Sequence, residues 1–259
     1  KNFLIISAEE LIYYIESKKK LNFKKPLLLL SFDDGYKDHY NYVLPILIKE
    51  KIKGCFYPPI DIFKNMMLNV NKLQFILSKT ENKKKLLNEI TNYLKKYGIY
   101  VKKKSISKIH NSKIPEYDDL ETLNIKKIIY KEISNEISNK ICNHLFKKYV
   151  NEDINDFSKK LYISKKELKE LNDNKMHIGS HGINHVMFST LSYLKQKKQI
   201  QASFEFFNKL KVNTDNFSLC YPWGSYNKIC KNVLIDTKIK FALTSDTGNF
   251  CLTNKYNKF

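Results

Sequence analysis

One stretch decides how this chain folds, and it reads Leu27-Leu28-Leu29-Leu30-Ser31-Phe32-Asp33-Asp34-Gly35. An apolar run that ends in two carboxylates and a glycine indicates a buried β-strand with acids at its C-terminal end, where α/β enzymes place their chemistry. Neighbouring strand residues point to opposite faces, so one acid can face a metal ion while the other faces a substrate or a water molecule. By itself Asp34-Gly35 is also ordinary turn chemistry, so this interpretation needs a partner elsewhere in the chain.

A second stretch supplies that partner. Three of the six histidines lie in His177-Ile178-Gly179-Ser180-His181-Gly182-Ile183-Asn184-His185. The two glycines favour a strand end that continues into a loop, although two histidines four residues apart could also share a helical face. Neutral imidazoles and one carboxylate form a three-ligand set for a divalent metal ion that leaves a position open for water, as in hydrolytic zinc sites. The two stretches together therefore predict a metal site.

A third stretch places the only tryptophan of the chain at the end of an apolar strand, in Phe217-Ser218-Leu219-Cys220-Tyr221-Pro222-Trp223-Gly224. Its ring could stack on a sugar there, and a backbone N–H could donate to a developing oxyanion. A core tryptophan beside a turn is the alternative interpretation. The last expected strand, at 241–246, again ends in a carboxylate, that of Asp246.

These stretches resemble, in order and in spacing, the motifs of the polysaccharide deacetylases of the NodB-homology type. The first motif looks like Ser31 to Gly35, the second like Ser180 to His185 and the third like Cys220 to Gly224. The resemblance covers about 25–60 and 175–250 of the chain. It implies an α/β fold, namely a distorted (β/α) barrel, formed by one catalytic domain that spans 1–259.

The resemblance also implies roles for individual residues. Asp34, His181 and His185 are expected to hold one divalent metal ion, with Zn²⁺ as the expected ion, and Asp33 to be the general base. The backbone N–H of Trp223 is expected to stabilise the oxyanion. The residues expected to bind the substrate follow the last two strands and are Tyr221, Pro222, Trp223 and Asp246.

The implied activity is hydrolysis of an N-acetyl group on a sugar of a bacterial glycan or its precursor. An O-acetyl esterase or an N-deformylase acting on a similar sugar is the alternative, as is a carbohydrate-binding protein of the same fold with weak catalysis. Two differences from the family motifs bear on the choice among these activities. Cys220 stands where many family members carry an arginine, and no histidine follows His185, although the family uses a later one as its general acid.

Apolar periodicity outside the motifs predicts the remaining elements. We expect helices at 7–17, 40–51 and 191–210 and strands at 54–57 and 176–180. The buried face expected for the 191–210 helix consists of Leu194, Ile200, Phe204, Phe207 and Leu210. Helical patterns at 71–77, 83–96, 131–149 and 164–171 dominate the middle of the chain. We therefore expect a largely helical insertion at about 61–174.

The amino-acid composition limits the classes of molecule that this protein is expected to bind. The net charge is +20, yet all 46 basic residues are lysines. Without arginine, whose guanidinium group donates paired hydrogen bonds to phosphates and bases, specific nucleic-acid binding is not expected. A carbohydrate is the expected partner, with an anionic glycan or membrane surface as a secondary attraction. Five scattered cysteines, Cys55, Cys142, Cys220, Cys230 and Cys251, favour a reducing compartment and hence the cytoplasm. No apolar run is long enough to span a bilayer, and a removed signal peptide stays an open alternative.

Overall fold

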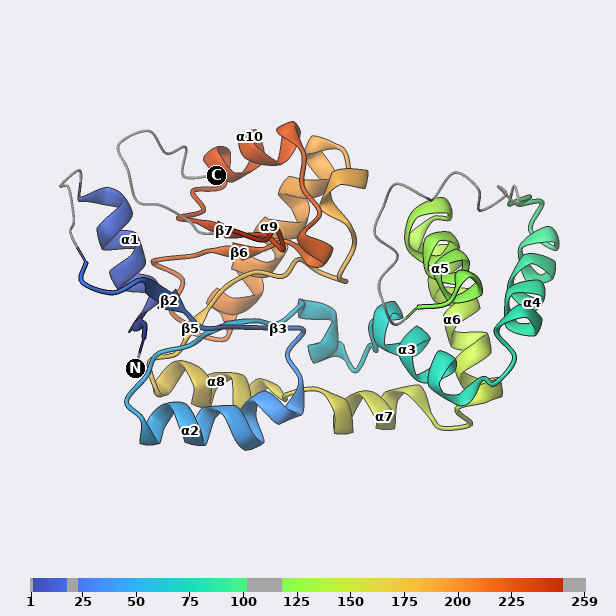
Figure 1. The fold of residues 1–259 in the computed structure, drawn as a ribbon, viewed down its shortest axis with the longest axis horizontal. Coiled ribbons are helices and arrows are strands. Elements are labelled where there is room, and N and C mark those ends of the chain that lie inside the picture. The colour runs from blue at the N-terminus through green and yellow to red at the C-terminus, as the bar shows by residue number, and fades with distance from the viewer. Residues whose placement is uncertain (1, 18–22, 102–117, 249–259) are drawn as a thin grey trace. The chain divides into compact units, whose positions relative to one another are not determined.

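The computed structural model describes residues 2–17, 23–101 and 118–248 (Figure 1). The chain divides into two compact units. One consists of Lys1–Met66 with Asn155–Phe259, and the other of Met67–Ile154. Each unit is described by itself below.

The described residues of the first unit form seven short strands, all paired in parallel. They are β1 (Leu4–Ile6), β2 (Leu27–Leu29), β3 (Ser31–Asp33), β4 (Cys55–Tyr57), β5 (His177–Ile178), β6 (Leu219–Cys220) and β7 (Ala242–Leu243). Their sheets have the orders β1-β2, β3-β4-β5 and β6-β7. Only Leu30 separates β2 from β3, and a bridge between Ser180 and Leu219 joins β5 to β6. The expected α/β class is confirmed, whereas the strands of the described residues form small sheets and no closed barrel.

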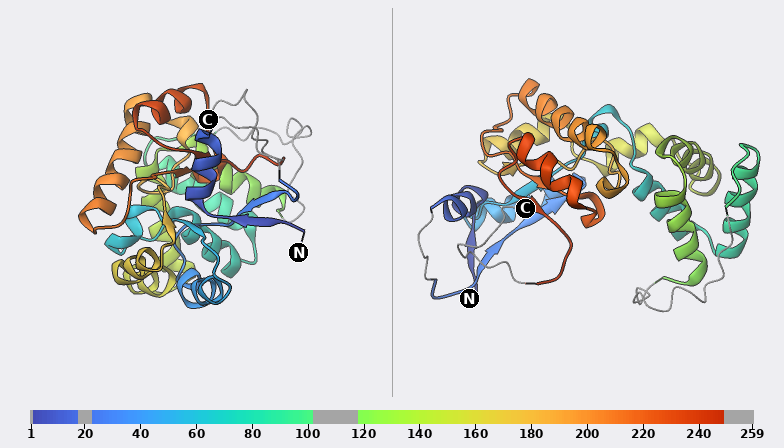
Figure 2. Two further views of the ribbon diagram at one scale, coloured as in Figure 1. Left: turned by 90° about the vertical axis from the view of Figure 1, so that its left-hand side faces the viewer. Right: turned by 90° about the horizontal axis from the view of Figure 1, so that it is seen from above.

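Helices connect and cover these strands. They are α1 (Ala8–Glu16), η1 (His39–Val43), α2 (Leu44–Lys49), η2 (Ile60–Lys64), α7 (Ile154–Leu161), α8 (Lys165–Asp173), η5 (Phe188–Thr190), α9 (Tyr193–Lys209), η6 (Pro222–Gly224) and α10 (Lys228–Asp236). Capping boxes start α1 and α8, where Ser7 pairs with Glu10 and Ser164 with Glu167. Figures 1 and 2 show α2 and α8 side by side, with α9 on the other side of the strands next to α10.

The core of this unit forms where α1 packs on the strands. Ala8 and Ile12 of α1 meet Cys55 and Tyr57 of β4. Tyr57 is fully buried and lies so close to the backbone of Gly179 that a Cβ atom at that glycine would be 2.3 Å from Tyr57 Cε1. The strand that leads to His181 therefore passes directly over an aromatic ring, and only glycine leaves room for this approach.

The second unit is helical throughout its described residues. It contains α3 (Asn69–Lys79), α4 (Lys83–Lys95), α5 (Leu120–Lys127), η4 (Ile128–Glu132) and α6 (Asn135–Tyr149). Helix α3 packs on α6, and α4 packs on α5. The aliphatic face of α4 is buried at Leu86, Ile90 and Leu94, with the four-residue spacing of an amphipathic helix. Among the described residues, no helix has the length and apolarity needed to cross a membrane.

Candidate metal site

Asp34, His181 and His185 meet at the C-terminal ends of the parallel strands. Asp34 directly follows β3, and the two histidines lie in the loop that follows β5. The Oδ1 atom of Asp34 is 3.6 Å from Nε2 of His181 and 3.4 Å from Nε2 of His185. Potential ligand atoms of all three residues lie within 4.8 Å of one another. Two atoms that each bind one zinc ion at about 2.1 Å are at most about 4.2 Å apart, so both measured separations fit a shared ion.

Two atoms of this group show that it suits a cation. Asp34 Oδ1 and His181 Nε2 are buried and have no hydrogen-bond partner among the described residues. A buried polar atom without a partner is costly, and a metal ion would satisfy both atoms at once. On the other side of its ring, His181 Nδ1–H donates to the carbonyl of Cys220 over 2.7 Å. This bond fixes the tautomer and leaves the Nε2 lone pair facing Asp34.

The electrostatics of the site favour neutral imidazoles. Burial lowers the pKa of His181 to about 4, and the neighbouring His185 adds to this effect while Asp34 opposes it. Burial also lowers the pKa of His185 to about 4. Burial raises the pKa of Asp34 to about 6, and the charge of Asp33 contributes to the rise. Near neutral pH both histidines can thus offer a lone pair, and Asp34 is mostly ionised.

The backbone turns sharply at each of the three motifs. Asp34, His185 and Trp223 are non-glycine residues with φ of 61°, 56° and 62°. Such left-handed conformations cost energy and concentrate at functional sites. At the first motif, Gly35 also has a positive φ, and a Cβ atom there would lie 2.5 Å from Ile62 Cδ1. These turns aim the side chains of the strand ends at one another.

Two side chains near Asp34 in the sequence interact with its carboxylate. Tyr36 donates its hydroxyl hydrogen bond to Asp34 Oδ2 over 3.2 Å. Asp33 is the last residue of β3, and its charge acts on Asp34 and both histidines. The nearby His39 is half-buried, and its ring packs against those of Phe32, Tyr36 and Phe56.

The third motif places its residues in different environments. Trp223 is 39% exposed, and its ring lies 5.3 Å from that of His185. Tyr221 and Pro222 are buried, and the Tyr221 ring stacks on Tyr226. Asp246 is exposed and accepts a hydrogen bond of 2.7 Å from the Tyr226 hydroxyl. The structure thus brings Trp223 to the metal cluster and leaves the substrate contacts of the other three residues as predictions.

Helix α9 holds the histidine loop in a way that the sequence does not reveal. Gln199 Oε1 accepts from the backbone N–H of Ile183 over 2.6 Å, and Ser203 donates to the carbonyl of Gly182 over 3.2 Å. The expected apolar face of this helix is right for Ile200 and Phe207, which are buried, and wrong for Leu194 and Phe204, which are exposed. The buried face also includes Gln196 and Ser203. Polar residues at helical spacing on a buried face are the only sequence signal for this role.

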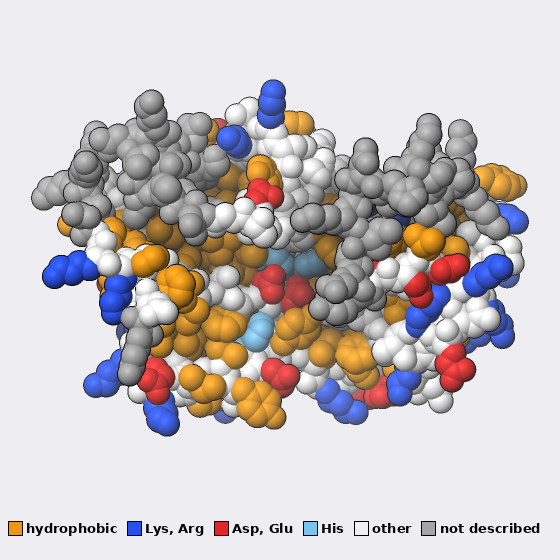
Figure 3. Space-filling view, in the orientation of Figure 1, with side chains coloured by type: hydrophobic (Ala, Val, Ile, Leu, Met, Phe, Trp, Pro, Cys, Tyr) orange, Lys and Arg blue, Asp and Glu red, His pale blue; other side chains and the backbone are white. Residues whose placement is uncertain are grey.

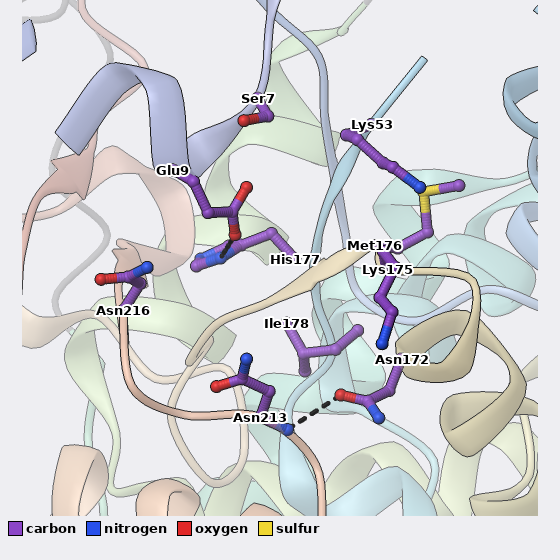
Figure 4. Close-up of a pocket in the computed structure, with 10 residues that line it drawn as sticks. All are labelled: Ser7, Glu9, Lys53, Asn172, Lys175, Met176, His177, Ile178, Asn213 and Asn216. Atoms are coloured by element: carbon purple, nitrogen blue, oxygen red, sulfur yellow. Dashed lines mark hydrogen bonds and ion pairs between the residues drawn. The ribbon is translucent and has the colours of Figure 1, made fainter. Parts of the chain in front are cut away.

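His177 lies at the other end of β5 from the metal cluster. It lines a polar cavity of about 430 Å³ together with Glu9, Lys53 and three asparagines (Figure 4). Its Nδ1 atom is 3.7 Å from Glu9 Oε1, and its Nε2 atom is 2.7 Å from the hydroxyl oxygen of Ser218. The interaction with His177 lowers the pKa of Glu9 to about 2. Of the three clustered histidines, His177 therefore has a structural role, since it contacts Glu9 and Ser218 and lies away from the metal cluster.

In the space-filling view, acidic side chains adjoin histidines on a face otherwise rich in hydrophobic side chains (Figure 3). This pattern agrees with the distances above, since carboxylates and imidazoles there share one patch. A few polar groups set among apolar side chains are typical of a small-molecule site.

Comparisons with known proteins agree with the motifs. The family model described as polysaccharide deacetylase matches residues 81–242, a stretch that contains the second and third motifs, while the first lies ahead of it. No curated protein matched the chain.

Three solved structures have similar folds. Streptococcus pyogenes deacetylase PplD in complex with acetate is 17% identical with a TM-score of 0.52, over 95% of this chain and 67% of that one. The BpsB deacetylase domain from Bordetella bronchiseptica is 13% identical with a TM-score of 0.52, over 95% and 73%. IcaB from Ammonifex degensii is 12% identical with a TM-score of 0.50, over 93% and 69%. At such identities the likeness concerns the fold alone.

Proposed function

Because this chain belongs to the polysaccharide deacetylase family, we propose that it is a metal-dependent hydrolase that removes an N-acetyl group from a sugar of a bacterial glycan or its precursor. The observation that carries the proposal is the cluster of Asp34, His181 and His185, with two buried polar atoms that lack partners, beside the second carboxylate of Asp33. Three protein ligands leave one position of a tetrahedral ion open for water, which is typical of a catalytic and not of a structural zinc site.

Asp34, His181 and His185 would hold the ion, and a carboxylate with two imidazoles suits Zn²⁺. When bound, zinc supplies Lewis-acid chemistry, since it polarises a carbonyl oxygen and lowers the pKa of water. The hydrogen bond from His181 to the Cys220 carbonyl would keep the ring oriented throughout the reaction.

Further roles in the attack of water on the acetyl group fall to residues of this chain. Asp33 would take the proton from the attacking water, as a general base at the strand end. The backbone N–H of Trp223 would donate to the oxyanion that forms on the acetyl carbonyl, and its half-exposed ring would stack on the sugar. Tyr221, Pro222 and Asp246 would complete the substrate contacts around it.

The same proposal extends to the architecture. The parallel bridge between β5 and β6, and the single residue between β2 and β3, would make the three small sheets arcs of one distorted barrel. The helical unit of 67–154 would then be an insertion within a single catalytic domain. Its helices contribute none of the residues that cluster at the proposed metal site.

The test compares two substitutions of neighbouring acids. Asp33→Asn should retain the metal ion and lose acetate release by a factor on the order of 10²–10⁴, because the amide is a far weaker proton acceptor. Asp34→Asn should lose metal affinity first and regain part of its activity when metal is added. The matched control is Asp38→Asn, since Asp38 is an exposed acid in the same loop.

Metal content is measured by elemental analysis and acetate release on N-acetylated sugars. Equal metal loss in both variants would show that the roles of Asp33 and Asp34 are assigned wrongly. Acetate release from O-acetylated sugars alone would favour the esterase, and tight sugar binding without turnover would favour the binding protein.

A further inference from the structure

A cavity of about 370 Å³ lies beside the first motif and is lined by residues of η2, α7 and the start of α8. Three lysines line it, namely Lys159, Lys165 and Lys166. None of the described residues that line the cavity is acidic. Its charge therefore has one sign, unlike that of the polar cavity around His177, whose lining includes Glu9 as well as two lysines.

The wall of this cavity is bonded to the segment that carries Asp34. Ile163, a lining residue, donates its backbone N–H to the carbonyl of Gly35 over 3.0 Å. The ring of Tyr162, another lining residue, stacks on Tyr36 with centroids 6.2 Å apart. Because Tyr36 also donates to Asp34, a single residue contacts both the cavity wall and the proposed metal ligand. The cavity is thus connected to Asp34 through two side chains, those of Tyr162 and Tyr36.

Two of the three lysines lie at the unfavourable end of a helix, although Lys165 also lies 5.9 Å from the centroid of the Phe206 ring. Lys165 and Lys166 are the first two residues of α8, where positive charges oppose the helix dipole. The acid of that turn, Glu167, is engaged in the capping box and in an ion pair of 2.6 Å with Lys37. Lys159 pairs with Asp156 at 3.0 Å, but both side chains are more than half exposed, so water screens the pair.

A buried hydroxyl adds a donor to the same wall. Ser158 is 1% exposed and lines the cavity, and its Oγ atom has no hydrogen-bond partner among the described residues. A buried hydroxyl without a partner costs free energy that a bound acceptor would recover. Lysine ammonium groups, a free hydroxyl donor and the amide of Asn65 together suit the oxygen atoms of an anion.

We propose that this cavity binds a negatively charged group, a phosphate or a carboxylate, on the glycan whose acetyl group is removed at the neighbouring metal site. The inference rests on the proposed function and narrows its substrate to an acidic glycan. The charged group would sit on a sugar next to the acetylated one and would fix the position of the glycan relative to Asp34.

The experiment compares wild-type protein with Lys165→Gln/Lys166→Gln on three acetylated oligosaccharides of equal length, one neutral, one phosphorylated and one containing a uronic acid. For wild-type protein we expect a KM about tenfold lower for at least one charged oligosaccharide than for the neutral one. The double variant should lose this gain and keep its kcat and its KM for the neutral substrate. Which charged oligosaccharide is preferred identifies the group.

The matched control is Lys195→Gln/Lys209→Gln, which removes two exposed lysines of α9 outside the cavity. The control should keep the preference for charged substrates. Equal KM values for all three oligosaccharides, a preference that survives in the cavity variant, or its equal loss in the control would each overturn the inference. Circular dichroism checks that both variants fold, and Lys166→Gln alone serves as a milder change.

A failure of the anion site can be distinguished from a failure of the proposed deacetylase function. If no oligosaccharide is hydrolysed, the proposed function fails, and a titration with the unacetylated phosphorylated and uronate oligosaccharides still decides the inference. Wild-type protein should then bind one of them about tenfold more tightly than the cavity variant does, with an affinity that falls as salt is added. Equal affinity of the two proteins for both oligosaccharides would reject the anion site.

Discussion

The close approach of Tyr57 to Gly179 leads to a quantitative prediction for Gly179→Ala. The new Cβ atom would lie 2.3 Å from Tyr57 Cε1, 2.7 Å from its Cδ1 and 2.8 Å from the hydroxyl oxygen of Ser218. Carbon atoms in contact are about 3.5–4.0 Å apart, so the ring must retreat by more than about 1 Å. Tyr57 is fully buried, and its hydroxyl is 3.0 Å from that of Ser218, so the ring has nowhere to go without losing this bond.

The size of the effect follows from these two losses. Overpacking a core costs about 1–3 kcal/mol, and a buried hydrogen bond contributes about 0.5–1.5 kcal/mol. Gly179→Ala should therefore lower the free energy of unfolding by about 2–4 kcal/mol. The backbone of Gly179 does not have a positive φ, so the cost is steric and not conformational.

Urea unfolding followed by circular dichroism measures the change, and two variants control it. Gly54→Ala should cost less, because its nearest neighbour is the terminal Cδ1 atom of Leu47 at 2.8 Å, which can rotate away. Replacing Tyr57 by Val should relieve the clash, so that Gly179→Ala costs at least about 1 kcal/mol less in that background. A cost below about 0.5 kcal/mol in wild-type background, or the same cost with and without the ring, would refute the reasoning.

Three further predictions concern the site, the acid limit of stability and the cysteines. Gln199→Leu should lower metal affinity about 10–100-fold, because Ile183 loses the acceptor that fixes the histidine loop, whereas Gln201→Leu on the exposed side of α9 should leave a metal titration unchanged. The pKa of Glu9 falls from 4.5 to about 2 on folding, so its ionised form stabilises the fold above pH 4.5 and this contribution disappears as the pH drops towards 2. Urea midpoints of wild-type protein and Glu9→Gln should therefore differ at pH 6 and converge at low pH, and a constant difference would contradict the assignment. Burial raises the pKa of Cys55 and of Cys142 to about 12, so iodoacetamide should modify neither thiol in the native protein at pH 8, as mass spectrometry of the peptides would show.

Local signals predict much of the fold. Helix α1 spans Ala8–Glu16, within the range 7–17 that its apolar pattern predicts. The leucine run ahead of Asp33 becomes β2 and β3, and the apolar stretch before Pro58 becomes β4. The sequence analysis misses β1, α7 and α10. Strand β1 has only three residues, and neither helix begins with the Ser-x-x-Glu pattern that precedes α1 and α8.

The site is less predictable than the fold. The motifs identify Asp34 and the two histidines as candidate ligands, because carboxylates and imidazoles bind metal ions directly through their side chains. Gln199 and Ser203 act through the backbone of the histidine loop, so only their positions in space reveal them. The expected face of α9 is wrong at Leu194 for the same reason. Hydrophobicity alone predicts a buried Leu194 and an exposed Gln196, whereas Gln196 is buried and donates hydrogen bonds to the carbonyls of Phe188 and Leu191.

The left-handed backbone at Asp34, His185 and Trp223 has a consequence for protein engineering. A designer who transplants only the side chains onto regular strand ends would aim them in the wrong directions, because right-handed or extended residues project their Cβ atoms elsewhere. The transferable unit is the three loops with their glycines and the supporting helix α9. Any scaffold that is to receive this chemistry must tolerate three strained residues, and so needs stability to spare.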